Sequence, residues 1–134
     1  MDWFAAGWPR EGDGGDAPFL ADVMRTDVPT CAAGDAVGDV RARLDGGDWE
    51  ECVVVNPQRV VIGLLDAERL GADGRLPAEL AMRLAPSTFR PSLPVRELAE
   101  YMRSKRLRSV LATTADGELL GVARREDVER EAAS

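Results

Sequence analysis

The hydrophobic and polar positions of this chain repeat after a shift of 58 residues, so that residues 23–70 align with 81–128 without a gap. Met24-Arg25 aligns with Met82-Arg83, and Gly63 aligns with Gly121. Further aligned pairs are Thr30 and Thr88, Val37 and Val95, Val40 and Leu98, Leu44 and Met102, Trp49 and Leu107, and Cys52 and Val110. Two copies of this length are typical of a pseudo-twofold pair of motifs rather than of a long repeat array.

Each copy predicts the same order of elements. A short extended piece (29–31 or 87–89) precedes a helix whose apolar residues recur at spacings of three and four (37–44 or 95–102). An apolar run rich in β-branched residues (52–55 or 110–113), a turn and a second strand (60–64 or 119–123) follow, and a helix closes the copy. The order β-α-β-β-α, twice, predicts an α+β fold of the α/β type, with a connection over 71–80 and helical structure within 78–83.

Residues 1–18 differ in composition from the rest. They combine glycines and aspartates with Trp3, Phe4 and Trp8, and the sequence predicts a flexible acidic tail before two motifs at 19–76 and 77–134. The aromatic residues leave two interpretations open: the tail folds back onto its own domain, or it is a docking segment for a partner.

Composition and charge exclude several functions. The chain contains no histidine, which removes His-based nucleophile triads, His general bases and most zinc or iron sites. The net charge of −7 argues against non-specific nucleic-acid binding, although residues 83–134 carry 10 basic and 8 acidic residues and could offer a local anion site. The acidic residues are scattered rather than paired, and no phosphate-binding loop of the Walker type is present, so we expect no catalysis.

Cysteine usage and hydropathy point to the cytoplasm. Cys31 and Cys52 lie in apolar stretches and indicate buried free thiols in a reducing compartment. The N-terminus lacks a basic, apolar leader, and no stretch approaches the roughly 18 apolar residues of a membrane span, so we expect no membrane association.

The gapless double copy, the Met-Arg pair before the first strand and the glycine-containing strand that runs into an acidic helix resemble a tandem pair of cystathionine-beta-synthase (CBS) domains, a Bateman module. The resemblance covers about residues 19–130. It implies two motifs packed through their sheets about a pseudo-twofold axis, with clefts for adenosyl compounds such as AMP, ADP, ATP, S-adenosylmethionine or a dinucleotide. It also implies a homodimer.

The ligand signature of that family is Gly-x-x-Thr/Ser-x-x-Asp, in which the aspartate accepts hydrogen bonds from a ribose. The second copy keeps Gly121 and Asp127 but carries Arg124 at the hydroxyl position. The first copy carries Asp66 and Arg69 at the hydroxyl and aspartate positions, where a carboxylate would repel phosphate and a guanidinium cannot accept from a ribose. We therefore expect the first cleft to be degenerate, with Asp66 serving as a helix N-cap.

The resemblance places the ligand at the second copy. By position, the implied binding residues are Gly121, Val122, Arg124, Asp127, Ser87, Thr88, Phe89, Arg108 and Ser109. Each has a structural alternative: Asp127 as a carboxylate in the first turn of a helix, Thr88 as a strand entry, and residues 103–108 as the solvated end of a helix.

Two functional hypotheses follow. In the first, the chain is a non-enzymatic regulatory CBS pair that binds an adenosyl nucleotide in one cleft, acts through its homodimer and controls a protein partner. In the second, it is a degenerate pair that serves as a ligand-free dimerisation or protein-docking module.

Overall fold

A computed structural model describes residues 18–84 and 86–133 of the chain. The elements of the first half are α1 (Leu20–Val23), β1 (Thr30–Cys31), α2 (Val37–Leu44), β2 (Cys52–Val55), β3 (Val61–Leu65) and α3 (Ala67–Leu70). Those of the second half are α4 (Ala78–Ala81), β4 (Thr88–Phe89), α5 (Val95–Lys105), β5 (Ser109–Thr113), β6 (Leu119–Arg124) and α6 (Arg125–Ala132).

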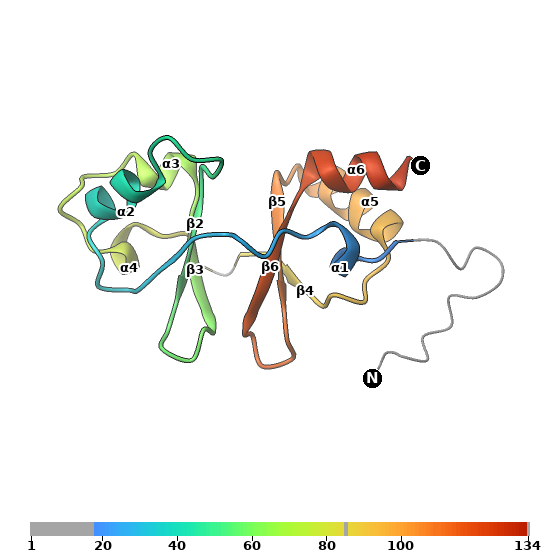
Figure 1. The fold of residues 1–134 in the computed structure, drawn as a ribbon, viewed down its shortest axis with the longest axis horizontal. Coiled ribbons are helices and arrows are strands. Elements are labelled where there is room, and N and C mark those ends of the chain that lie inside the picture. The colour runs from blue at the N-terminus through green and yellow to red at the C-terminus, as the bar shows by residue number, and fades with distance from the viewer. Residues whose placement is uncertain (1–17, 85, 134) are drawn as a thin grey trace.

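Each half contains a three-stranded sheet with the same topology. The strand orders are β1-β2-β3 and β4-β5-β6, with the first pair of strands parallel and the second pair antiparallel. The two sheets stand side by side in the middle of the molecule, and the longer helices lie on the outer flanks (Figure 1). This arrangement confirms the predicted α+β fold and the predicted strands and main helices, with small differences at their ends.

A buried apolar cluster joins the two sheets. It combines Val53 of β2 with Leu111 of β5 and Val122 of β6, and Val28, Trp49 and Leu119 complete it. Because apolar faces of small sheets are stable only when they are covered, each half covers the sheet of the other.

The segment that leads into the first strand of each half packs on the other half. These lead-in segments begin with α1 and α4 and end before β1 and β4. The N–H of Leu20 in α1 donates to the carbonyl of Leu93 at 2.8 Å, and the N–H of Ala78 in α4 donates to the carbonyl of Asp35 at 2.7 Å. Leu20 is fully buried in the core of the second half, whereas Ala78 is fully buried in the core of the first. In Figure 1 α1 accordingly lies beside α5 and α6, and the chain then crosses to the first half.

The exchange continues into the sheets and explains the repeated glycines. Arg25 pairs with Val122 of β6, and Arg83 pairs with Leu64 of β3. A Cβ atom on Gly121 would lie 2.7 Å from the carbonyl oxygen of Arg25. One on Gly63 would lie 2.2 Å from the sulfur of Met82. Both glycines are therefore needed for the close approach of the opposite lead-in segment.

Two sequence interpretations have a direct structural answer. Asp66 is the N-cap of α3, as predicted, and its Oδ1 accepts from the N–H of Arg69 at 2.9 Å. Cys31 and Cys52 are free and buried, as predicted. The interpretation of the tail with Trp3, Phe4 and Trp8 lies outside the described residues.

Gly121→Ala should destabilise the fold by roughly 1–3 kcal/mol, because the added methyl group overlaps the backbone at Arg25. Gly34→Ala is the matched control, since a Cβ at Gly34 meets nothing within 4 Å. The free energy of unfolding from urea titrations measures both. Equal values for the two variants would contradict the close-approach explanation.

Candidate functional site

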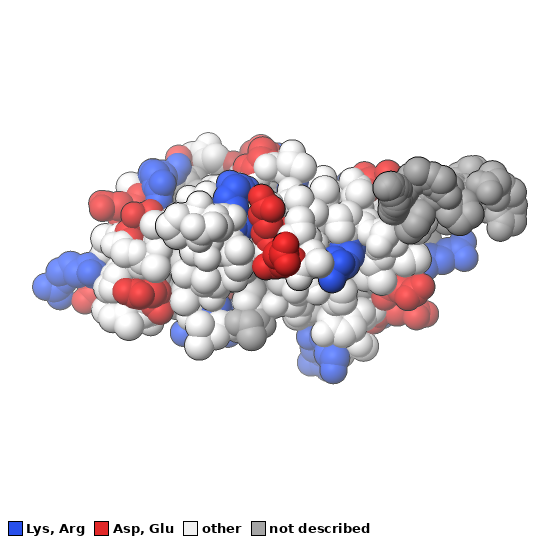
Figure 2. All heavy atoms as spheres, turned by 90° about the horizontal axis from the view of Figure 1, so that it is seen from below, with Lys and Arg blue, Asp and Glu red and all other residues white. Residues whose placement is uncertain are grey.

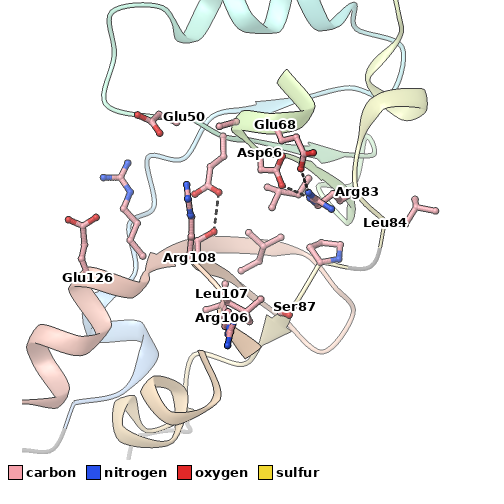
Figure 3. A pocket seen from close by; sticks show the side chains of 18 of the residues that line it. Glu50, Asp66, Glu68, Arg83, Leu84, Ser87, Arg106, Leu107, Arg108 and Glu126 are labelled. Carbon is pink, nitrogen blue, oxygen red and sulfur yellow. Dashed lines mark hydrogen bonds and ion pairs between the residues drawn. The ribbon is translucent and has the colours of Figure 1, made fainter. Parts of the chain in front are cut away.

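A cavity of about 830 Å³ lies where the two halves meet. The first half contributes Leu64, Asp66 and Glu68 from the end of β3 and from α3, together with Asp48, Glu50 and Glu51. The second half contributes Arg83, Leu84 and Ser87 of the lead-in, residues 106–111 around the start of β5, and Arg124 and Glu126 (Figure 3). The exchange of lead-in segments therefore builds this site from both halves.

The acidic wall of the cavity is already neutralised in part. Arg83 forms ion pairs with both Asp66 and Glu68, and all three side chains point toward one another in Figure 3. Burial alone would raise the pKa of Asp66, but the N–H of Arg69 and the guanidinium of Arg83 hold it below its usual value of 3.8. Asp66 is therefore a carboxylate held by a cap and an ion pair.

The opposite wall carries cations without such partners. Arg106 and Arg108 are exposed and line the cavity. Within residues 18–84 and 86–133, neither guanidinium makes a hydrogen bond or an ion pair. Arg106 ends α5 in the left-handed conformation, with φ of 56°, and this turn leads into the start of β5. Both charges are therefore available to an anion in the cavity.

A carboxyl group at the junction of the halves is partly desolvated. Glu51 Oε2 accepts a hydrogen bond from Ser109 Oγ at 3.0 Å. Burial raises the pKa of Glu51 above its usual value of 4.5, and the Ser109 hydroxyl and the Arg124 charge offset only part of that effect. Glu51 and Ser109 thus join the two halves through side chains inside the cavity.

Arg124 lines the cavity and makes two contacts with the first half. Its Nη2 donates to the carbonyl of Asp48 at 2.8 Å. Its guanidinium lies 4.3 Å from the ring centroid of Trp49, a distance typical of a cation–π contact. Arg124 is the N-cap residue of α6, and its side chain makes no cap hydrogen bond.

The structure divides the predicted site residues between several places. Ser87, Arg108, Ser109 and Arg124 line the cavity. Thr88 and Phe89 line a separate hollow of about 430 Å³ with Leu93 and Pro94. Gly121 and Val122 are buried in β6 against the first lead-in segment. Asp127 does not line the cavity and is ion-paired with Arg130 one turn along α6.

Sequence reasoning missed Arg83 and Glu51 as members of the site. The Met-Arg repeat marked Arg83, but its place in the cavity depends on the exchange of lead-in segments. Glu51 had a usable signal, since the repeat aligns it with Ser109, its hydrogen-bond partner.

Charges elsewhere on the molecule are mixed. On the face shown in Figure 2, acidic and basic side chains alternate, and the described residues there form no continuous basic stripe. In the part of the chain that the structure covers, no group of three or more Cys, Asp or Glu is placed to hold a metal ion. The same residues contain no helix with the length and apolarity needed to cross a bilayer.

Comparison with known proteins identifies the fold. Residues 78–134 match the family model of the CBS domain. The CBS domains of a transcriptional regulator from Streptococcus pneumoniae are 18% identical with a TM-score of 0.76, over 84% of this chain and 97% of that one. No curated protein matches the sequence significantly.

Two further similar structures contain adenosyl compounds. CBSX2 in complex with AMP is 18% identical, with a TM-score of 0.77 over 87% of this chain and 96% of that one. The CBS domain pair of protein MJ0100, in complex with 5'-methylthioadenosine and S-adenosyl-L-methionine, is 15% identical, with a TM-score of 0.76 over 85% and 94%.

The chain thus has the architecture of an α+β module with two CBS-like motifs. Its fold is that of a tandem CBS-domain pair, a Bateman module, and its second half matches the CBS domain by sequence as well.

Glu51→Gln should change how stability depends on pH. Because the pKa of Glu51 is raised in the folded state, its contribution to stability is full below the usual value of 4.5 and is lost as pH rises through the raised value. The unfolding free energy of the wild type, minus that of the variant, should therefore fall as pH rises from 4 toward neutrality, roughly the range above an ordinary Glu pKa. Urea titrations across this pH range measure the two unfolding free energies. A difference between them that does not change with pH would contradict the desolvation of Glu51.

Proposed function

We propose that this chain is a non-catalytic regulatory module that binds an adenine nucleotide in the cavity between its halves. The observation that carries the proposal is the pair of guanidinium groups, Arg106 and Arg108, that have no side-chain partner among the described residues and line a cavity of about 830 Å³. Ligand pockets of roughly 300–1,000 Å³ accommodate small molecules of the size of a nucleotide.

One wall of the cavity favours a phosphate-bearing ligand. Arg106 and Arg108 offer donors in the fork geometry that suits phosphate oxygens. Two of the carboxylates in the cavity, Asp66 and Glu68, are held by Arg83 and repel an anion less than free carboxylates would. Asp48, Glu50 and Glu126 also line the cavity. The two guanidinium groups of Arg106 and Arg108 support AMP, ADP or ATP over S-adenosylmethionine, which has no phosphate.

The rest of the cavity suits a nucleoside. Leu107, which is half-buried, supplies apolar surface for a base. The hydroxyls of Ser87 and Ser109 and the carboxylate of Glu51 are hydrogen-bonding groups for a ribose. The similar structures that contain AMP or S-adenosylmethionine add support from the same fold.

Arg108→Ala should weaken the affinity for ATP roughly ten- to hundred-fold, because a hydrogen bond to a charged group is worth about 1.5–3 kcal/mol. Arg96→Ala is the matched control: Arg96 is exposed on α5 and does not line the cavity. Isothermal titration calorimetry with AMP, ADP, ATP and S-adenosylmethionine measures both variants. Equal losses of ATP affinity in both variants would show that the ligand does not contact Arg108.

Asp127→Ala tests where the ribose lies. The resemblance to the family implies that Asp127 accepts from the ribose, whereas a ligand confined to the cavity would not reach a residue outside its lining. In the cavity placement, Asp127→Ala leaves the affinity for ATP within about two-fold of the wild type in the same calorimetric titration. A ten- to hundred-fold loss would place the ribose at Asp127. A flat response of the wild type to every compound would favour the ligand-free docking module instead.

Regulation through a homodimer is part of the proposal. We expect sedimentation equilibrium at micromolar concentration to give twice the 14.5 kDa mass of one chain. A ligand would then control a protein partner by favouring one arrangement of the halves or subunits, by no more than its difference in affinity for the two arrangements. A monomer at all concentrations would remove the dimer from this scheme.

A further inference from the structure

The pseudo-twofold relation gives the residues of the cavity counterparts 58 positions away, and some of these pairs, such as Glu51 and Ser109, both line the cavity. Other pairs are divided between the cavity and the opposite side of the axis. Leu107 corresponds to Trp49, and Arg83 corresponds to Arg25. Leu107 and Arg83 line the cavity, whereas Trp49 and Arg25 do not. The two sides of the molecule are therefore related in backbone and different in what fills them.

Trp49 fills the counterpart side. Its side chain is 9% exposed, and it packs against the cluster that joins the two sheets. The guanidinium of Arg25 lies 4.9 Å and that of Arg124 lies 4.3 Å from the ring centroid of Trp49. The indole N–H donates to Asp27 Oδ2 at 3.4 Å. The indole is thus held as a bound aromatic ring would be, by two cations and a hydrogen bond.

The partners of Trp49 are themselves held in place. Arg25 forms an ion pair with Asp27 at 2.8 Å, and this contact keeps the pKa of Asp27 below its usual value. Arg124 is fixed by its hydrogen bond to the carbonyl of Asp48. Both guanidinium groups are therefore also held by contacts that do not involve the ring.

The charged groups do not divide in this way, because the cavity extends across the axis. The counterparts of Arg106 and Arg108 are Asp48 and Glu50, and all four residues line the cavity. The two sides therefore differ through the residues at the positions of Leu107 and Trp49 rather than through these charges.

We propose that Trp49 occupies a preformed, arginine-lined slot for a planar aromatic ring, and that it restricts the chain to one open nucleotide cleft. The slot itself stands on the contacts of Trp49, while the restriction to one nucleotide rests on the proposed function. Trp49 is then the residue that determines how many ligands each chain binds.

The slot is tested by emptying it and refilling it. Trp49→Ala should lower the thermal midpoint, and millimolar indole should restore several degrees of it, because a ligand that binds only the folded state stabilises it. Indole should leave the wild type within one degree, roughly the precision of such a measurement. Leu119→Ala is the matched control, since it truncates the same apolar cluster without an arginine-lined slot and should not be rescued.

A second variant locates the indole. Trp49→Ala combined with Arg25→Ala should lose the rescue, because Arg25 contacts Trp49 and does not line the open cavity. If Trp49→Ala does not fold, Trp49→Leu, which introduces the residue of the counterpart position, replaces it in the same titration. Absence of rescue in the folded variant, or equal rescue of Leu119→Ala, would overturn the slot.

Calorimetry with ATP tests the restriction to one cleft. The wild type should bind one ATP per chain, and two per chain with Trp49 in place would overturn the restriction. Absence of ATP binding would count against the proposed function, whereas indole rescue of Trp49→Ala would still support the slot.

Discussion

The structure depends on the exchange of lead-in segments between its two halves. Arg25 can pair with Val122, and Arg83 with Leu64, only because Gly121 and Gly63 leave room for the opposite backbone. The same exchange places α1 on the second core and α4 on the first. It also brings Arg83 and Ser87 to face Asp66, so the cavity exists because the chain crosses between the halves.

A symmetric backbone with asymmetric side chains explains why the two sides differ. At one pair of positions the chain has Leu107 and Trp49. On one side Leu107 lines an open cavity. On the other side Trp49 lies against the guanidinium groups of Arg25 and Arg124. The shared fold determines where ligands could lie, and these few side chains determine what each place can accept.

The repeat in the sequence was sufficient to predict the fold, because apolar spacing and turn residues report directly on helices and strands. It predicted the cap at Asp66 for the same local reason. The cavity was harder to predict. Reasoning within one copy grouped Ser87, Arg108 and Asp127, but the exchange joins Ser87 and Arg108 to Asp66 of the other copy and leaves Asp127 outside the lining. A local sequence pattern does not show which residues of the two copies meet in the cavity, because this depends on the half to which each lead-in segment crosses.

The matching hydrogen bonds of the two halves have a consequence for the origin of the chain. The bonds from Leu20 to Leu93 and from Ala78 to Asp35 are the same contact, made once in each direction across the axis. A peptide of half this length could make every such contact with a second copy of itself, as in a domain-swapped dimer. The present chain is therefore equivalent to such a dimer whose subunits have been fused. Because both halves belong to one chain, each side can carry its own side chains, which two identical subunits cannot do.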